Sequence, residues 1–153
     1  MDAVTEARLA LVTKYAAKYN LDAALVCAVC EQESSWNQWA VRYEPLFFTR
    51  YIQPLLNNNT VHTMTEATCR ATSYGYLQVM GQTAREAGFA GRYLTQLCEP
   101  DTGLDIGCHV LRDKLQKANG DWHQGLQFYN GGGDPNYADE VLARVAKYKP
   151  TED

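Results

Sequence analysis

The sequence has no apolar stretch of the length that a membrane-spanning helix needs, so we expect no integral membrane segment. It also has little excess charge, because 14 Lys and Arg residues face 18 Asp and Glu residues, for a net charge of −4. That balance argues against generic binding to nucleic acid or to anionic membrane surfaces. Hydrophobic residues make up 46% and charged residues 21% of the 153 positions, which is typical of one folded domain over residues 1–153.

The sequence also lacks a set of residues at metal-ligand spacing. Cys27 and Cys30 form a C-x-x-C motif, but they lie in an apolar helical run and no second Cys or His pair follows them. The histidines, His62, His109 and His123, are scattered along the chain. We therefore interpret Cys27 and Cys30 as buried small hydrophobic residues, and we expect no metal site and no cofactor.

A secretory leader is not visible either. The segment Met1 to Glu6 is acidic and has neither the basic start nor the apolar run of a signal peptide. We therefore expect the chain to be made in the cytoplasm. Cys98 and Cys108 flank a short loop, and we expect them to form a disulfide only in an oxidising compartment.

Apolar residues recur with a helical period along most of the chain, which predicts a mainly α structure. Asp22 is the expected N-cap of the second helix, and Asp121 that of a helix near the C-terminal end. Residues 73–80 are β-like in composition, and residues 100–103 are expected to form a loop. Helices are predicted at residues 5–19, 22–34, 46–51 or beyond, 65–67, 83–87, 104–118, 121–128 and 135–145, with a short helix or turn at 91–97.

One stretch, Leu25 to Asn37, combines an apolar helical run with a carboxylate, Glu33, where that run stops. The negative end of the helix dipole and an apolar neighbour such as Trp36 both disfavour the charged form of this carboxylate. We expect its pKa to be raised, which suits a general acid near neutral pH. Taken alone, the stretch is more typical of an ordinary exposed glutamate near a helix end, and only the later motifs reverse that preference.

Three short motifs follow one another in order. They are Glu33-Ser34 with Trp36-Asn37, then Ser73 to Met80 (SYGYLQVM), then Phe128 to Gly132 (FYNGG). In this order they resemble the soluble lytic transglycosylase family, which shares a fold with goose-type lysozyme. The resemblance implies a mainly α, α+β lysozyme-like fold, a single globular domain of about eight helices with at most a small β region beside the catalytic cleft.

The resemblance also implies an activity on peptidoglycan. The family cleaves the β-1,4 bond between N-acetylmuramic acid (MurNAc) and N-acetylglucosamine (GlcNAc). Glu33 aligns with the family's catalytic glutamate, which donates a proton to the glycosidic oxygen and then accepts the proton of the sugar's own C6 hydroxyl, closing a 1,6-anhydro ring. Water and a second carboxylate are not needed, unlike in the usual two-carboxylate glycosidase.

A set of substrate-binding residues carries over from the same motifs. Gln78 matches a glutamine able to hold sugar groups or the acid, and Gly75 matches a glycine that lets the backbone approach the substrate. Tyr129 matches the tyrosine whose hydroxyl reaches toward the catalytic acid, while Tyr137 is expected to be a groove aromatic. The complete predicted set is Ser34, Ser73, Gly75, Tyr76, Gln78, Met80, Tyr129, Asn130 and Tyr137.

The segment between the first two motifs is long, and it carries Glu44 and Glu66. Either carboxylate, by placing a water molecule, would turn the enzyme into a hydrolysing muramidase that works with Glu33. Glu44 is the better candidate of the two, but we favour slightly the interpretation that it forms an ion pair with Arg42 or is a solvated turn residue. A hypothesis of another class is a catalytically inactive glycan-binding module, against which the intact Glu33 and Gln78 argue.

The expected partners are peptidoglycan glycan strands, with the chain acting as a monomer. Made without a leader, the protein would act on the cell wall, on its periplasmic or extracellular side, after release or export. A phage endolysin works in this way, but a bacterial wall-remodelling enzyme or a domain from a longer protein fits the sequence equally.

Overall fold

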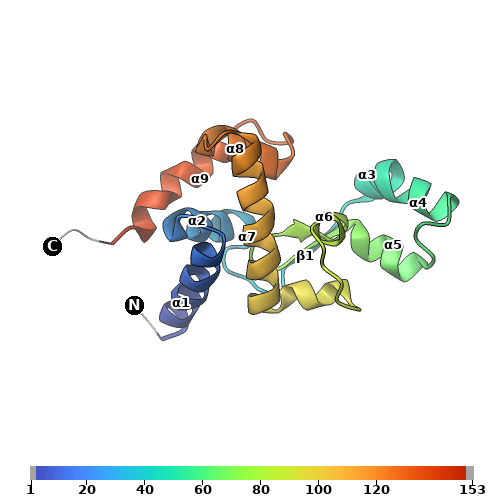
Figure 1. Cartoon of the computed structure of the whole chain (residues 1–153), viewed down its shortest axis with the longest axis horizontal. Coiled ribbons are helices and arrows are strands. Elements are labelled where there is room, and N and C mark those ends of the chain that lie inside the picture. Colours follow the sequence, from blue (N-terminus) through green and yellow to red (C-terminus); the bar gives the residue numbers. More distant parts are fainter. Residues whose placement is uncertain (1–2, 151–153) are drawn as a thin grey trace. The chain divides into compact units, whose positions relative to one another are not determined.

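The computed structural model describes residues 3–150, with side chains from residue 5 onward, and most of them are helical (Figure 1). Residues 1–2 and 151–153 lie outside the described residues. Met1 and Asp2 belong to the N-terminal segment that was considered above for a signal peptide. The helices and strands confirm the predicted mainly α composition with a small β region. They are α1 (Ala3–Lys18), α2 (Ala23–Ser34), β1 (Val41–Tyr43), α3 (Pro45–Phe47), the π-helical η1 (Phe48–Ile52), α4 (Gln53–Asn57), α5 (Met64–Arg70), β2 (Thr72–Tyr74), β3 (Val79–Met80), α6 (Gly81–Glu86), the 3₁₀ turn η2 (Leu94–Cys98), α7 (Pro100–Lys117), α8 (Trp122–Asn130), α9 (Tyr137–Val145) and the 3₁₀ turn η3 (Ala146–Tyr148).

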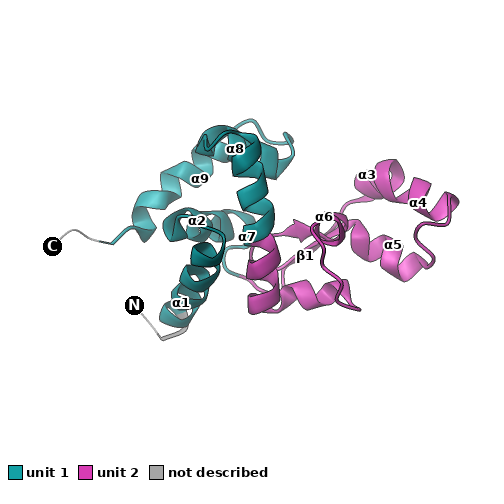
Figure 2. Cartoon of the chain, in the orientation of Figure 1, with its two compact units in different colours: residues 1–36, 108–153 teal, residues 37–107 magenta. Residues whose placement is uncertain are grey.

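The chain divides into two compact units (Figure 2). Unit 1 is built from both ends of the chain, residues 1–36 and 108–153, and unit 2 from residues 37–107 between them. The helix α7 contributes its first turns to unit 2 and the remainder to unit 1. One domain over residues 1–153 stays a prediction.

Unit 1 is a group of helices around the buried helix α2. Asp22 caps α2 by accepting a hydrogen bond from the Leu25 N–H at 3.0 Å, as predicted. The helix packs against α1, α9 and η3, and α9 packs in turn against α8. Every residue from Ala24 to Cys30 is buried, so α2 has no polar face over this length. Other large core residues of unit 1 are Val12, Leu111, Leu126 and Val141.

Unit 2 contains the small sheet, in the antiparallel order β1-β2-β3. Strands β2 and β3 form a hairpin in which Ser73 pairs with Met80 and Tyr74 with Val79. The predicted β character of residues 73–80 therefore corresponds to two short strands and a turn. A core cluster of unit 2 consists of Ile52, Val61, Ala67 and Ala71, which come from η1, α5 and the segments that follow them.

One expectation for this region was wrong, and one strand was missed. The helix predicted from Leu46 to Tyr51 or beyond is confirmed as part of a longer helical run from Pro45 to Asn57, in which Pro54 is tolerated because it lies in the first turn of α4. The strand β1 was not predicted. The expected loop at 100–103 is the start of α7, which begins at Pro100. Within residues 3–150, no helix is both long and apolar enough to cross a membrane.

Candidate active site

Glu33 lies one residue before the end of α2, where the sequence predicts the helix to stop. The stop is local: Ser35 takes a left-handed conformation with φ 48°, and Trp36 follows with φ 62°. Ser34 donates its hydroxyl to the Cys30 carbonyl at 3.0 Å, so this hydroxyl is used on the helix backbone. The Glu33 side chain is half-buried. The buried helix thus carries a carboxyl group to its own C-terminal edge.

Tyr137, the first residue of α9, contacts this carboxyl group directly. Its hydroxyl donates a hydrogen bond to Glu33 Oε1 at 2.6 Å, and its side chain is only 4% exposed. Burial, and after it the charge of Glu33, raise the pKa of Tyr137 far above its ordinary value. The hydroxyl therefore stays protonated and acts as a donor. The family resemblance implies this role for Tyr129, where it stays a prediction, and a groove position for Tyr137.

Tyr129 also lies within electrostatic range of Glu33. Burial of its hydroxyl raises the pKa of Tyr129 well above its ordinary value, and the charge of Glu33 adds to this effect. Asn130 ends α8 and, with its amide oxygen turned to the following loop, accepts from the Asp134 N–H at 2.9 Å and the Gly133 N–H at 3.1 Å. Asn130 therefore shapes the loop after α8, and its contact with substrate stays a prediction.

A network that sequence reasoning missed fixes the other side of the α2 end. Glu31 accepts hydrogen bonds from Arg144 Nη1 at 2.8 Å, from Lys147 Nζ at 2.9 Å and from the Tyr148 hydroxyl. Trp36 Nε1 donates to the same hydroxyl at 3.0 Å. Burial alone would raise the pKa of Glu31, but the hydrogen bonds from Tyr148 and Lys147 outweigh it and lower this pKa. Glu31 is thus a fixed anion that ties α2 to α9 and η3.

The residues of the second motif lie in unit 2, in the β2–β3 hairpin. Gln78 has φ 48°, and its amide Nε2 donates to the Ala40 carbonyl at 2.9 Å and the Gly75 carbonyl at 3.0 Å. Its Oε1 accepts from the Ser73 hydroxyl at 2.9 Å. The amide therefore closes the turn onto the segment before β1. Its predicted contact with sugar groups stays a prediction.

Other predicted residues of this hairpin are largely buried. Gly75 has φ 71°, and a Cβ there would lie 2.7 Å from the Leu97 carbonyl oxygen, so only glycine fits. Ser73 and Tyr76 are 7% and 5% exposed and belong to the interior of unit 2. Met80 is half-buried and precedes α6 as its N-cap residue. These positions support the hairpin, and their substrate contacts stay predictions.

The two candidates for a second carboxylate are both paired with arginine. Glu44 Oε1 lies 2.8 Å from Arg42 Nε, the ion pair that the sequence analysis favoured. Glu66 Oε1 lies 3.0 Å from Arg70 Nε and 2.8 Å from Arg85 Nε. Burial alone would raise the pKa of Glu66, but the hydrogen bonds from Arg85 and Arg70 outweigh it and lower the pKa. Neither pairing favours a role in placing water.

The five cysteines are all free thiols, so Cys98 and Cys108 are not joined. Four of them are buried, and Cys69 is half-buried. Among residues 3–150, no group of three or more His, Cys, Asp or Glu side chains is arranged to hold a metal ion.

The comparison with known proteins gives one family. The family model described as the transglycosylase SLT domain matches residues 10–148. This match includes both units and all three sequence motifs. Neither the curated proteins nor the solved structures contain a significant match to the chain.

Proposed function

The chain belongs to the transglycosylase SLT domain family, and from that premise we propose that Glu33 is the catalytic residue of a peptidoglycan lytic transglycosylase. The family acts on peptidoglycan as lytic transglycosylases do. The observation that carries the proposal for this chain is the 2.6 Å hydrogen bond from the buried Tyr137 hydroxyl to Glu33. It fixes one acid at the end of a buried helix.

The proposed reaction needs only this acid. Protonated Glu33 donates its proton to the oxygen of the MurNAc–GlcNAc bond, and the bond between C1 and that oxygen breaks. The resulting carboxylate takes the proton of the MurNAc C6 hydroxyl, whose oxygen forms a new bond to C1. The products are a GlcNAc hydroxyl and a 1,6-anhydro-MurNAc end, and water is not consumed.

The surroundings of Glu33 suit this double use. Tyr137 holds Oε1 and so orients the carboxyl group for the proton transfers. Because burial keeps the Tyr137 hydroxyl protonated, Tyr137 does not compete with Glu33 as a base. A hydrogen bond of 2.6 Å to a carboxyl oxygen is in the range of charge-assisted bonds, which also favours a fixed orientation.

The test is Glu33→Gln, which keeps the shape of the side chain but cannot transfer the proton. We expect the variant to lose at least about a thousandfold in clearing of purified cell walls, because general acid–base catalysis contributes about 10²–10⁴-fold and here one residue does both steps. Glu44→Gln is the matched control, and we expect it to keep activity. Clearing by Glu33→Gln at the wild-type rate would remove Glu33 from the mechanism.

Mass spectrometry of the digested wall then distinguishes the alternatives. Anhydro-MurNAc ends support the transglycosylase, whereas reducing MurNAc ends identify a hydrolysing muramidase, for which Glu44→Gln or Glu66→Gln would lose activity. Absence of soluble products with wild-type protein identifies a glycan-binding module. We propose that the active protein is a monomer acting at the cell wall.

A further inference from the structure

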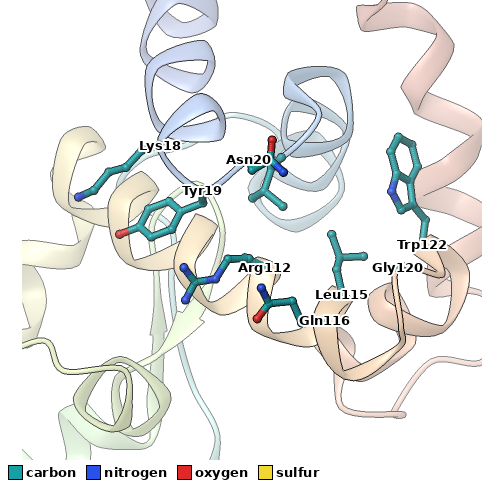
Figure 3. Close-up of a pocket in the computed structure, with 9 residues that line it drawn as sticks. Lys18, Tyr19, Asn20, Arg112, Leu115, Gln116, Gly120 and Trp122 are labelled. Atoms are coloured by element: carbon teal, nitrogen blue, oxygen red, sulfur yellow. The ribbon is translucent and has the colours of Figure 1, made fainter.

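A second concave site lies in unit 1, at the end of α1 and along α7 to the start of α8 (Figure 3). Its volume is about 410 Å³, which lies within the range of small-molecule sites. None of its lining residues belongs to the predicted catalytic or substrate-binding set. They are Lys18, Tyr19, Asn20, Leu21, Arg112, Leu115, Gln116, Gly120 and Trp122.

The charged lining residues of this second site are cations, Lys18 and Arg112, and no carboxylate lines it. Arg112 is oriented by Asp113 beside the site: Nε and Nη2 lie 3.1 and 2.8 Å from Asp113 Oδ1. This contact uses the Nε and Nη2 edge of the guanidinium group and does not involve Nη1. A guanidinium group that is oriented along one edge in this way suits recognition of a second carboxylate along another.

The Tyr19 ring organises these cations. Lys18 Nζ lies 5.2 Å and Arg112 Cζ 5.3 Å from its centroid, both at cation–π distance. The His109 ring stacks on it at 5.6 Å with an interplanar angle of 7°. His109 in turn faces Asp113 at 3.4 Å. The aromatic and charged groups therefore hold one another in place before any ligand arrives.

The rest of the lining suits a sugar. Trp122 provides a half-buried indole, and Asn20 and Gln116 provide exposed amides that donate and accept hydrogen bonds. The backbone positions are fixed by local stops. Asn20 follows α1 with φ 55°, and Gly120 turns the chain before α8 with φ 84°. Asp121 then caps α8 by accepting from the Gln124 N–H at 2.9 Å.

We propose that this pocket is a second binding site for peptidoglycan that takes a muramoyl-peptide unit. The peptide carboxylate lies against Lys18 and Arg112, and the sugar lies against Trp122. The proposal rests on the proposed function, because peptidoglycan joins a sugar and a carboxylate-bearing peptide in one unit. With a net charge of −4 the chain has no general attraction for such an anionic polymer, so two cations in one pocket give attachment a defined place.

The experiment uses the isotopically labelled full chain carrying Glu33→Gln, titrated with N-acetylmuramoyl dipeptide and observed by NMR. The three tryptophans give three indole N–H signals: Trp122 reports the second site, Trp36 reports the end of α2, and Trp39 reports unit 2. We expect the Trp122 signal to shift in a saturable way. Arg112→Gln should weaken this binding about tenfold.

Arg92→Gln, which removes the same charge from an exposed position in unit 2, is the matched control and should bind as the parent does. Shifts confined to Trp36 and Trp39, or equal Trp122 binding in Arg112→Gln, would overturn the second site and leave the proposed function intact. An equal Trp122 shift with N-acetylglucosamine alone would overturn recognition of the carboxylate. Wall clearing is measured separately. If Glu33→Gln still clears walls at the wild-type rate, the proposed function fails. The dispersed spectrum of each variant reports its folding.

Discussion

At Glu33, one buried hydroxyl group fixes the orientation of the carboxyl group. Tyr137 reaches Glu33 from a position 104 residues later in the chain, and its hydroxyl is buried where it has little water as an alternative partner. A buried donor that loses its acceptor, or an acceptor that loses its donor, costs about 1–3 kcal/mol. The pair is therefore expected to matter both for stability and for orientation of the acid.

Tyr137→Phe tests this directly, because it removes the hydroxyl and keeps the ring in the core. We expect wall clearing to fall about tenfold and the free energy of unfolding to fall by about 1 kcal/mol. Tyr51→Phe is the matched control, since Tyr51 is 49% exposed in unit 2. Full activity in Tyr137→Phe would mean that this hydrogen bond does not position Glu33.

The sequence was sufficient for residues whose role depends on near neighbours. Asp22 and Asp121 cap their helices as predicted, and Glu33 lies at a helix end because Ser35 and Trp36 leave the helix immediately afterwards. It was not sufficient for Tyr137, because that contact depends on how α9 packs against α2. The family resemblance pointed instead to Tyr129, which lies in the recognisable motif.

At the scale of elements, close packing around α7 explains a glycine inside a helix. A Cβ at Gly107 would lie 2.3 Å from Leu77 Cδ1 and 2.8 Å from Leu77 Cβ, and Leu77 is 1% exposed. Alanine in place of glycine would gain about 1 kcal/mol in helix propensity. The overlap involves Leu77 near its backbone, so the side chain cannot simply rotate away, and overpacking costs about 1–3 kcal/mol.

We therefore predict that Gly107→Ala lowers the free energy of unfolding by about 1–2 kcal/mol, measured by urea denaturation. Gly133→Ala is the control, because a Cβ at that position meets nothing within 4 Å. A Gly107→Ala variant more stable than wild type would show that helix propensity outweighs the contact with Leu77.

The ion pairs of Glu66 join α5 to α6, and they predict how stability depends on acid. The pKa of Glu66 is lowered from 4.5 in the folded chain, so on acidification the unfolded chain takes up this proton first. The contribution is complete above the unfolded pKa and is lost as the pH falls through the folded one. We expect the melting temperature to drop below about pH 4.5, and Glu66→Gln to start lower and drop less.

Glu6 provides the control for this measurement, because Glu6→Gln removes one negative charge, as Glu66→Gln does, at an exposed position. We expect the melting temperature of Glu6→Gln to fall with acid as that of wild type does. If the melting temperature of Glu66→Gln falls with acid as steeply as that of wild type, carboxylates other than Glu66 cause the loss of stability in acid.

Some elements follow from sequence and others from tertiary contacts. The α2 helix is a long apolar run with a cap and a stop, so its bounds were predictable. Strand β1 has three exposed residues and no buried face, and it forms because its backbone pairs with β2. The run from Pro45 to Asn57 continues through a π-helical turn at Phe48–Ile52, which proline spacing alone would not predict.

At the scale of the whole molecule, both ends of the chain build unit 1, and unit 2 is an insertion in sequence between them. The acid and its tyrosine come from the first and last parts of unit 1, so the proposed catalytic pair forms only when residues far apart in the chain have packed. The hairpin with Gln78 forms in the inserted part. The predicted site residues are therefore divided between the two compact units.

The free cysteines give a prediction that covers both units. Burial raises the pKa of Cys27 to about 12 and raises the pKa of Cys30 and Cys98 as well, so these thiols are both shielded and protonated at pH 8. We expect a thiol reagent to modify only Cys69 quickly in the folded chain, and all five cysteines in urea without a reducing agent. Cys69→Ser is the control that should remove the fast phase. If only three thiols react in urea, two cysteines are joined, contrary to the structure. If a second thiol reacts quickly in the folded chain, part of a core opens readily.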